Sequence, residues 1–253
     1  MAELTNQVVS RQEWLDARKR LLIKEKEYTR LGDQLSEERR RLPWERVEKE
    51  YIFDGPTGKE TLAELFAGKS QLAVYHFMFG PDWDAGCPHC SFWADNFNGI
   101  DPHLKHRDVT FVAVSRAPLD KLEAFKRRMG WSFKWVSAGE NGFNYDYCVS
   151  FTPEQLAKGE ISYNYAVAKL IRSEMPGISA FYKKAEGEIY HTYSAYARGV
   201  DTVNGAYRWL DLMPKGRDEA SLAFKQSWLR YHDRYGSDYM PPGAQTSERA
   251  RPA

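Results

Sequence analysis

The chain has 253 residues, and its 36 Lys and Arg residues nearly balance its 35 Asp and Glu residues, which leaves a formal net charge of +1. This balance provides no general attraction to nucleic acid or to an anionic membrane surface. The mean hydropathy is −0.64, and the longest apolar run, residues 72–79, is far shorter than the roughly 20 residues that a membrane span needs. A hydrophobic fraction of 42% is enough to build a core. We therefore expect a folded protein with neither a nucleic-acid nor a membrane partner.

Residues 1–45 are predicted to form a helical N-terminal extension. Ser10 and Glu13 have the spacing of a capping box, which satisfies free backbone N–H groups at the start of a helix, and Pro43 ends the helix. Between them, apolar residues recur at roughly helical spacing among charged ones, namely Trp14, Leu15, Leu21, Leu22, Tyr28, Leu31 and Leu35. This stripe either packs on the chain's own sheet or joins two copies as a homodimer. The charged first thirty residues lack the apolar segment of a signal peptide, so we expect a cytoplasmic location.

Residues 46–215 are predicted to form the central domain, in which strands alternate with helices. Strands are expected at residues 51–53, 71–79, 109–115 and 133–136, and helices at residues 61–66, 91–97 and 118–129. The second and third strands are almost entirely apolar, which is typical of central strands buried on both faces. A helical stretch at residues 164–172 should precede a hairpin that turns at residues 185–188. This order predicts an α/β fold with a central mixed β-sheet flanked by helices.

The end of the chain is predicted to be helical before it becomes disordered. Helices are expected at residues 201–213 and 221–235, the second carrying Leu222, Phe224, Trp228 and Tyr231. Residues 216–253 would therefore hold a C-terminal helix and a flexible tail that begins after Pro241.

The Cys87-Pro88-His89-Cys90 turn is the strongest functional signal, because it follows the most apolar predicted strand and opens a helix. At a helix start, free backbone N–H groups and the helix dipole favour the thiolate form of the first cysteine. Cys87 would then attack a disulfide, and Cys90, one turn later, would resolve the mixed disulfide. His89 would add positive charge beside Cys87, and Pro88 fits the first helical turn without losing a hydrogen bond. The pattern favours a thiol–disulfide oxidoreductase that acts on a thiol or disulfide substrate and needs no cofactor.

Two other functions remain open at this stage. Cys87 and Cys90 could bind copper or zinc together with a histidine such as His89 or His191, although the chain has no second Cys-x-x-Cys pair. The domain could also be a non-catalytic binding module that uses an aromatic pocket from residues 143–151 and 190–196.

Four further residues carry weaker signals. Trp83 and Asp84 directly precede the turn and are candidates for shaping a substrate pocket above the sulfurs. His76 lies inside a predicted buried strand and is expected to be a hydrogen-bonded core residue rather than a base. The lone Cys148 is expected to be an inert buried thiol rather than a resolving one.

The dithiol turn resembles the active-site turn of the thioredoxin superfamily. The stretch from Gly177 to Tyr182 resembles the Gly-Ile-Pro-Thr hairpin of thioredoxins, with Ser179 at the position of their cis-proline. That alignment implies that Ser179 borders the cysteines and can donate a hydrogen bond toward the Cys87 thiolate.

The chain from Trp14 to about Glu219 also resembles the bacterial thioredoxin-like family known as domain of unknown function 899. The matching words are Leu42-Pro43-Trp44, residues 75–83, Cys87 with residues 91–95, residues 176–179, residues 191–194, Ala197-Arg198-Gly199 and Leu210-Asp211-Leu212. The resemblance implies a thioredoxin-like fold and leaves the reaction open, because a fold does not define a function.

Overall fold

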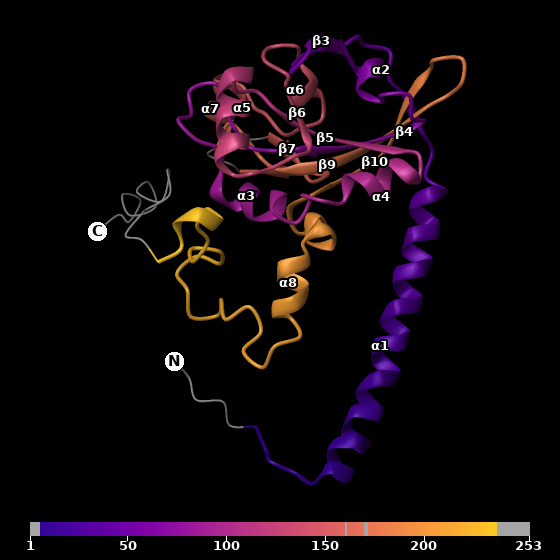
Figure 1. Cartoon of the computed structure of the whole chain (residues 1–253), viewed down its shortest axis with the longest axis vertical. Helices are drawn as coiled ribbons and strands as arrows, with labels where there is room; N and C mark the ends of the chain where they lie inside the picture. The colour runs from indigo at the N-terminus through magenta and orange to yellow at the C-terminus, as the bar shows by residue number, and fades with distance from the viewer. Residues whose placement is uncertain (1–5, 160, 170–171, 237–253) are drawn as a thin grey trace.

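The computed structural model describes residues 6–159, 161–169 and 172–236, and it is built around one mixed sheet (Figure 1). The strands of the sheet, in the order in which they lie side by side, are β1 (Glu45–Arg46), β10 (Ile189–Tyr196), β9 (Gly177–Lys183), β4 (Gln71–His76), β5 (Val109–Ser115), β6 (Lys134–Ser137), β2 (Ile52–Gly55) and β3 (Gly58–Thr61). β4 pairs in parallel with β5, and β5 in parallel with β6. β4 pairs antiparallel with β9 on its other side, and β9 continues into the antiparallel strand β10. This is a thioredoxin-like arrangement, as the resemblance implied.

Both faces of the sheet are covered, because successive side chains of a strand point to opposite faces. On β4, Ala73 and Tyr75 pack into one core cluster, and Leu72 and Val74 pack into another. The first face is covered by α3 (Pro88–Ala94), α4 (Asp101–His106), α5 (Leu119–Arg128) and α8 (Gly205–Leu210). The second face is covered by α2 (Leu62–Leu65) and α6 (Phe143–Asp146). The first face contains both cysteines of the dithiol turn.

A third, smaller core lies beside the main sheet. It packs around the two-stranded sheet of β7 (Ile161–Tyr163) and β8 (Ala166–Ala168), with α7 (Pro153–Lys158) against it. The helix predicted for residues 164–172 is therefore wrong as far as the described residues show, because residues 166–168 pair as a strand with residues 161–163. Residues 170–171 of that prediction lie outside the described residues.

The N-terminal extension is a continuous helix, α1 (Arg11–Arg40), that extends away from the sheet (Figure 1). The predicted capping box is confirmed, since the Ser10 side chain accepts from the Glu13 backbone N–H and the Glu13 carboxylate accepts from the Ser10 backbone N–H. No residue of α1 is buried, so its apolar stripe does not pack on the sheet. Among the described residues, contacts that tie α1 to the domain include one between the Tyr28 hydroxyl and Arg208 and one between Arg39 and the Tyr193 ring.

The end of the chain differs from the prediction. Residues 201–210 are divided between the 3-10 helix η1 (Ala197–Val203) and α8, separated by Asn204, whose side chain caps α8, and residues 211–213 form a turn. Within residues 216–236 the structure has no α-helix, only the 3-10 turn η2 (His232–Arg234). The predicted C-terminal helix is therefore wrong, because Leu229 and Tyr231 are both buried against the domain in an irregular segment. The tail predicted after Pro241 lies outside the described residues.

In the part of the chain that the structure covers, no helix combines the length and apolar character that crossing a membrane requires.

Candidate functional site: the Cys87 and Cys90 dithiol

The dithiol turn is fixed to the chain that leaves the carboxyl end of β4. The Cys87 backbone N–H donates to the Met78 carbonyl oxygen at 3.0 Å, and the Met78 backbone N–H donates to the Cys90 sulfur at 3.5 Å. Cys87 has non-helical dihedral angles and is the residue before α3, which begins at Pro88, three residues before the start predicted for this helix. Because Pro88 has no N–H to place, it is suited to this first helical position. These bonds bring the two sulfur-bearing residues onto one turn at the end of a central strand.

Gly86, directly before Cys87, can only be a glycine in this packing. A Cβ atom at this position would lie 2.7 Å from a carbon of the Phe77 ring and 3.1 Å from a carbon of the Phe125 ring. The backbone at Gly86 therefore packs directly against the buried rings of Phe77 and Phe125, and this contact sets how closely the turn approaches the core.

The surroundings of Cys87 favour its thiolate. The Cys90 thiol donates a hydrogen bond to the Cys87 sulfur, and this is the main cause that lowers the pKa of Cys87 well below the usual thiol range, against the opposing effect of burial. His89 adds to the effect, since its Nδ1 lies 3.8 Å from the Cys87 Sγ and its charge stabilises the thiolate. Burial disfavours the charged form of His89, but its hydrogen bond to Cys87 and the charge of that thiolate outweigh burial and raise the pKa of His89. Each of the two groups therefore favours the charged form of the other.

Cys90 has the opposite character. Burial, together with its hydrogen bond to Cys87, raises the pKa of Cys90 well above the usual range. The Tyr75 hydroxyl donates to the Cys90 carbonyl oxygen at 3.3 Å from the sheet below. The exposed fractions are 6% for Cys87 and 2% for Cys90, and both are free thiols. The pKa values of the two thiols on this turn are therefore shifted in opposite directions.

The two residues predicted to shape a pocket differ in their positions. Trp83 is partly buried and packs against the cluster that contains both cysteines. Its carbonyl oxygen accepts from the Lys121 ammonium at 3.1 Å. Asp84 is exposed. Trp83 therefore belongs to the core on the dithiol's side of the sheet, and Asp84 is on the protein surface.

The structure does not bring Ser179 to the cysteines. Its hydroxyl is 2.8 Å from His76 Nε2 and 2.7 Å from the Ser194 hydroxyl. The preceding residue, Ile178, is the one that packs against the cysteine cluster. Adjacent residues of a strand point to opposite faces, so Ser179 points away from the dithiol and its predicted role beside Cys87 is wrong. No cis peptide bond occurs among the described residues.

His76 and its neighbours form a separate polar row on that opposite face. The row continues from Ser194 to His191 Nε2 at 2.7 Å, and from His191 Nδ1 to the Glu45 carboxylate at 3.3 Å. His76 is buried, and burial lowers its pKa to about 3, so it is a neutral core histidine as expected.

The ligand sets considered for a metal ion are not assembled. In the described ranges no group of three or more His, Cys, Asp or Glu side chains is placed to hold a metal ion. His191 contacts Glu45 and Ser194 on the sheet face opposite the dithiol. Cys148 is half-buried, burial raises its pKa, and its hydrogen-bond partner is Ser162 rather than either cysteine of the turn.

Several residues around the dithiol carried no signal in the sequence. The ring of Phe224 lies 5.8 Å from the ring of His89, edge to face. His89 also bonds to the backbone of Gln226, and the Tyr231 hydroxyl donates to the Gly86 carbonyl oxygen at 2.6 Å. These three residues come from a segment whose apolar spacing is helical in sequence, and only the folded chain shows that they lie against the dithiol turn.

Comparison with known proteins gives one family and a set of remote structural likenesses. The family model described as "Bacterial protein of unknown function (DUF899)" matches residues 3–235. No curated protein sequence matches the chain. The similar solved structures include peroxidoxin BcpB from Mycobacterium tuberculosis, at 11% identity and a TM-score of 0.44, covering 66% of this chain and 97% of that one. They also include a variant of peroxiredoxin Q from Xanthomonas campestris, at 16% identity and a TM-score of 0.41, covering 62% and 90%. Likenesses of this size assign no reaction to the chain.

Proposed function

The chain belongs to the DUF899 family, and we propose that it is a thiol–disulfide oxidoreductase that works through Cys87 and Cys90. The observation that carries the proposal is the geometry of the turn: the Cys87 sulfur lies 3.8 Å from His89 Nδ1 at the start of α3, and Cys90 follows one turn later. Cys90 and His89 lower the pKa of Cys87, while burial raises the pKa of Cys90. A thiolate is the form of cysteine that attacks a disulfide.

The reaction runs in two exchanges. The Cys87 thiolate attacks one sulfur of a substrate disulfide, forms a mixed disulfide with it and releases the other sulfur as a thiolate, which takes up a proton. Cys90 then loses its proton and attacks the Cys87 sulfur, so that the Cys87 and Cys90 disulfide forms and the second substrate sulfur leaves as a thiol. The substrate gains two electrons and the protein loses two, which a thiol reductant restores. His89, as an imidazolium beside Cys87, stabilises the thiolate at the start and whenever Cys87 is the leaving group.

A metal-binding role has less support. It needs at least one further ligand beside the two sulfurs, and the residues that the structure describes assemble no such group. The proposal also includes a cytoplasmic setting, where a close cysteine pair is more often catalytic than structural.

A redox titration in glutathione buffers tests the proposal. The protein carries Cys148→Ser, so that Cys87 and Cys90 are the only thiols left. Alkylation followed by intact mass spectrometry then measures the fraction of this pair that is oxidised. We expect a reversible two-electron transition within the range of known dithiol oxidoreductases, about −120 to −270 mV. Cys87→Ser should abolish it, and Cys90→Ser should instead accumulate one glutathione on Cys87. A dithiol that shows no transition in this series contradicts the proposal.

A further inference from the structure

A segment near the end of the described chain lies against the dithiol turn on both sides of the cysteines. We call residues 224–233 the cover. Phe224 and Gln226 contact His89, between the two cysteines. Tyr231 bonds to Gly86 directly before them, and Trp228 packs edge to face on Phe92, two residues after Cys90. The cover therefore contacts the turn before, between and after its sulfurs.

The cover is clamped to the helices that flank the dithiol. Asp233 accepts two hydrogen bonds from the Arg128 guanidinium of α5, both at 2.9 Å. His232 Nδ1 lies 2.8 Å from an Asp95 carboxylate oxygen, directly after α3. Tyr231 is fully buried, with the Arg128 guanidinium over its ring. These contacts fix the C-terminal end of the cover to α5 and to the end of α3.

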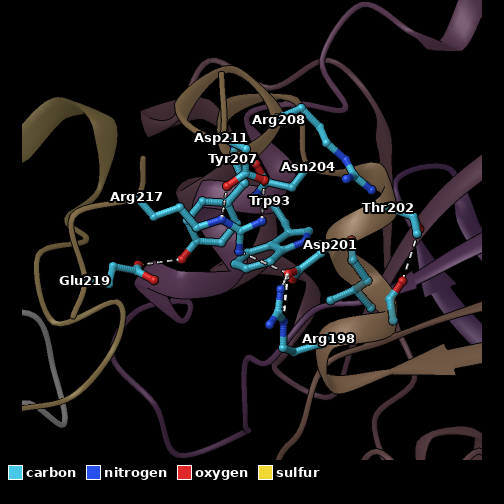
Figure 2. Close-up of polar contacts among 12 residues, drawn as sticks. Trp93, Arg198, Asp201, Thr202, Asn204, Tyr207, Arg208, Asp211, Arg217 and Glu219 are labelled. Carbon is cyan, nitrogen blue, oxygen red and sulfur yellow. Dashed lines mark hydrogen bonds and ion pairs between the residues drawn. The ribbon is translucent and has the colours of Figure 1, made fainter. Parts of the chain in front are cut away.

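The segment that precedes the cover is also fixed to the domain, through Arg217 and Glu219. Figure 2 shows the Arg217 guanidinium reaching the Asp211 and Asp201 carboxylates while it lies over the Tyr207 ring. Glu219 accepts from the Tyr207 hydroxyl at 2.9 Å, and the same oxygen accepts from the Trp228 indole N–H at 2.8 Å. Glu219 thus joins α8 to Trp228 in the middle of the cover.

We infer that the cover restricts the dithiol to small disulfides and excludes the disulfides of folded proteins. This inference rests on the proposed function and names its substrate class. Thiol–disulfide exchange requires direct approach of the attacking sulfur to the substrate sulfur. Cys87 is only 6% exposed, and the cover contacts Gly86 before it and His89 after it. A small disulfide needs only a narrow path to the Cys87 sulfur. A disulfide in a folded protein is surrounded by that protein's backbone, which would need the space that the cover occupies.

The test measures access to Cys87 without relying on catalysis. Reduced protein carrying Cys148→Ser is treated with N-ethylmaleimide or with the same maleimide attached to a long polymer, and peptide mass spectrometry follows the label on Cys87. In the unaltered cover we expect labelling by the polymer reagent to be slower than labelling by the small reagent by about tenfold or more, because local opening has to precede it.

Opening the cover should remove this difference. Asp233→Ala combined with Tyr231→Phe removes the ion pair and the bond to Gly86. We expect the rate with the polymer reagent to rise about fivefold, the size of effect typical of an ion pair of this exposure, while the rate with N-ethylmaleimide stays within about twofold. Phe224→Ala, a change at a half-exposed ring, should act in the same direction without affecting the fold. Glu60→Ala is the matched control, since it breaks a comparably exposed ion pair with Lys134 on β3 and β6 and should leave both rates unchanged.

The outcomes separate the cover from the chemistry. Equal labelling by the two reagents in the unaltered protein, or no response in either cover variant, overturns the inference. If the reagents discriminate but no redox transition exists, the cover stands and the proposed function fails. If both hold, the unaltered protein should reduce hydroxyethyl disulfide and not insulin, and the cover variants should gain insulin reduction.

Discussion

His89 Nδ1 lies 3.8 Å from the sulfur of Cys87, on the same turn and two residues further along the chain. Each group supports the charge of the other, since the pKa of Cys87 is lowered and that of His89 is raised. The contact that supports the Cys87 thiolate is therefore local in sequence, while the burial that opposes the charge of both groups comes in part from distant segments.

Replacing His89 tests this contact. His89→Ala should slow alkylation of Cys87 by iodoacetamide at pH 7 by about tenfold, because an adjacent opposite charge changes an ionisation equilibrium by about that factor. The pH profile of the rate should also move toward higher pH. His106→Ala, an exposed histidine at the end of α4, is the control and should change neither quantity. An unchanged profile in His89→Ala would leave Cys90 as the sole support of the thiolate.

The stability of the reduced protein should depend on pH through Cys87. A thiol whose pKa is lowered in the folded state contributes stability that is fully present above the ordinary thiol pKa and is lost as pH falls through the lowered value. The unfolding free energy of the reduced wild type, minus that of Cys87→Ser, should therefore grow as pH rises toward the ordinary thiol range. Urea unfolding in a strong reductant at several pH values measures this difference. A difference that is independent of pH would contradict a lowered pKa.

Glu174 should act in the opposite sense. Burial raises its pKa to about 7, against a bond from the Ser150 hydroxyl at 2.6 Å and the charge of Arg116. A raised carboxyl pKa means that the folded state binds more protons than the unfolded state between pH 4.5 and 7, so the unfolding free energy falls as pH rises across that window.

Glu174→Gln isolates that contribution. The wild type should lose at most about 3 kcal/mol through this group between those pH values, and the variant should lose less. Glu140→Gln, which changes the exposed partner of the same Arg116, is the control and should retain the wild-type slope. Parallel stability profiles for the wild type and Glu174→Gln would show that Glu174 does not titrate in this range.

Gly86→Ala should destabilise the fold through the turn. The added methyl group would overlap the Phe77 ring, and overpacking of a close-packed core costs about 1–3 kcal/mol. Urea unfolding measures the loss, and Gly86→Ala combined with Phe77→Leu should recover part of it. Gly32→Ala, in open space on α1, should cost nothing. Full stability in Gly86→Ala would mean that the turn can shift away from the sheet.

The sequence predicted the parts whose signals are local. The capping box at Ser10 located the start of α1, and the apolar runs located β4, with the dithiol that follows it, and β5. Ser179 was misplaced because alignment to a hairpin fixes a position along the strand but not the face to which the side chain points. The helix expected around Trp228 and Tyr231 failed because these side chains are held by Glu219 and Gly86, contacts that no local pattern encodes.

The exposure of the long α1 helix has a consequence for the rate of hydrogen exchange along it. Its 30 residues span roughly 45 Å at 1.5 Å per residue, and none of them is buried. Helical backbone bonds that lack tertiary cover break at the low free energies of helix fraying. Amide hydrogens from Arg11 to about Tyr28, where the first tie to the domain occurs, should therefore exchange with solvent deuterium far faster than those of β4. If protection from exchange increases along α1 toward Arg40, the helix is stabilised mainly by its attachment to the domain at that end.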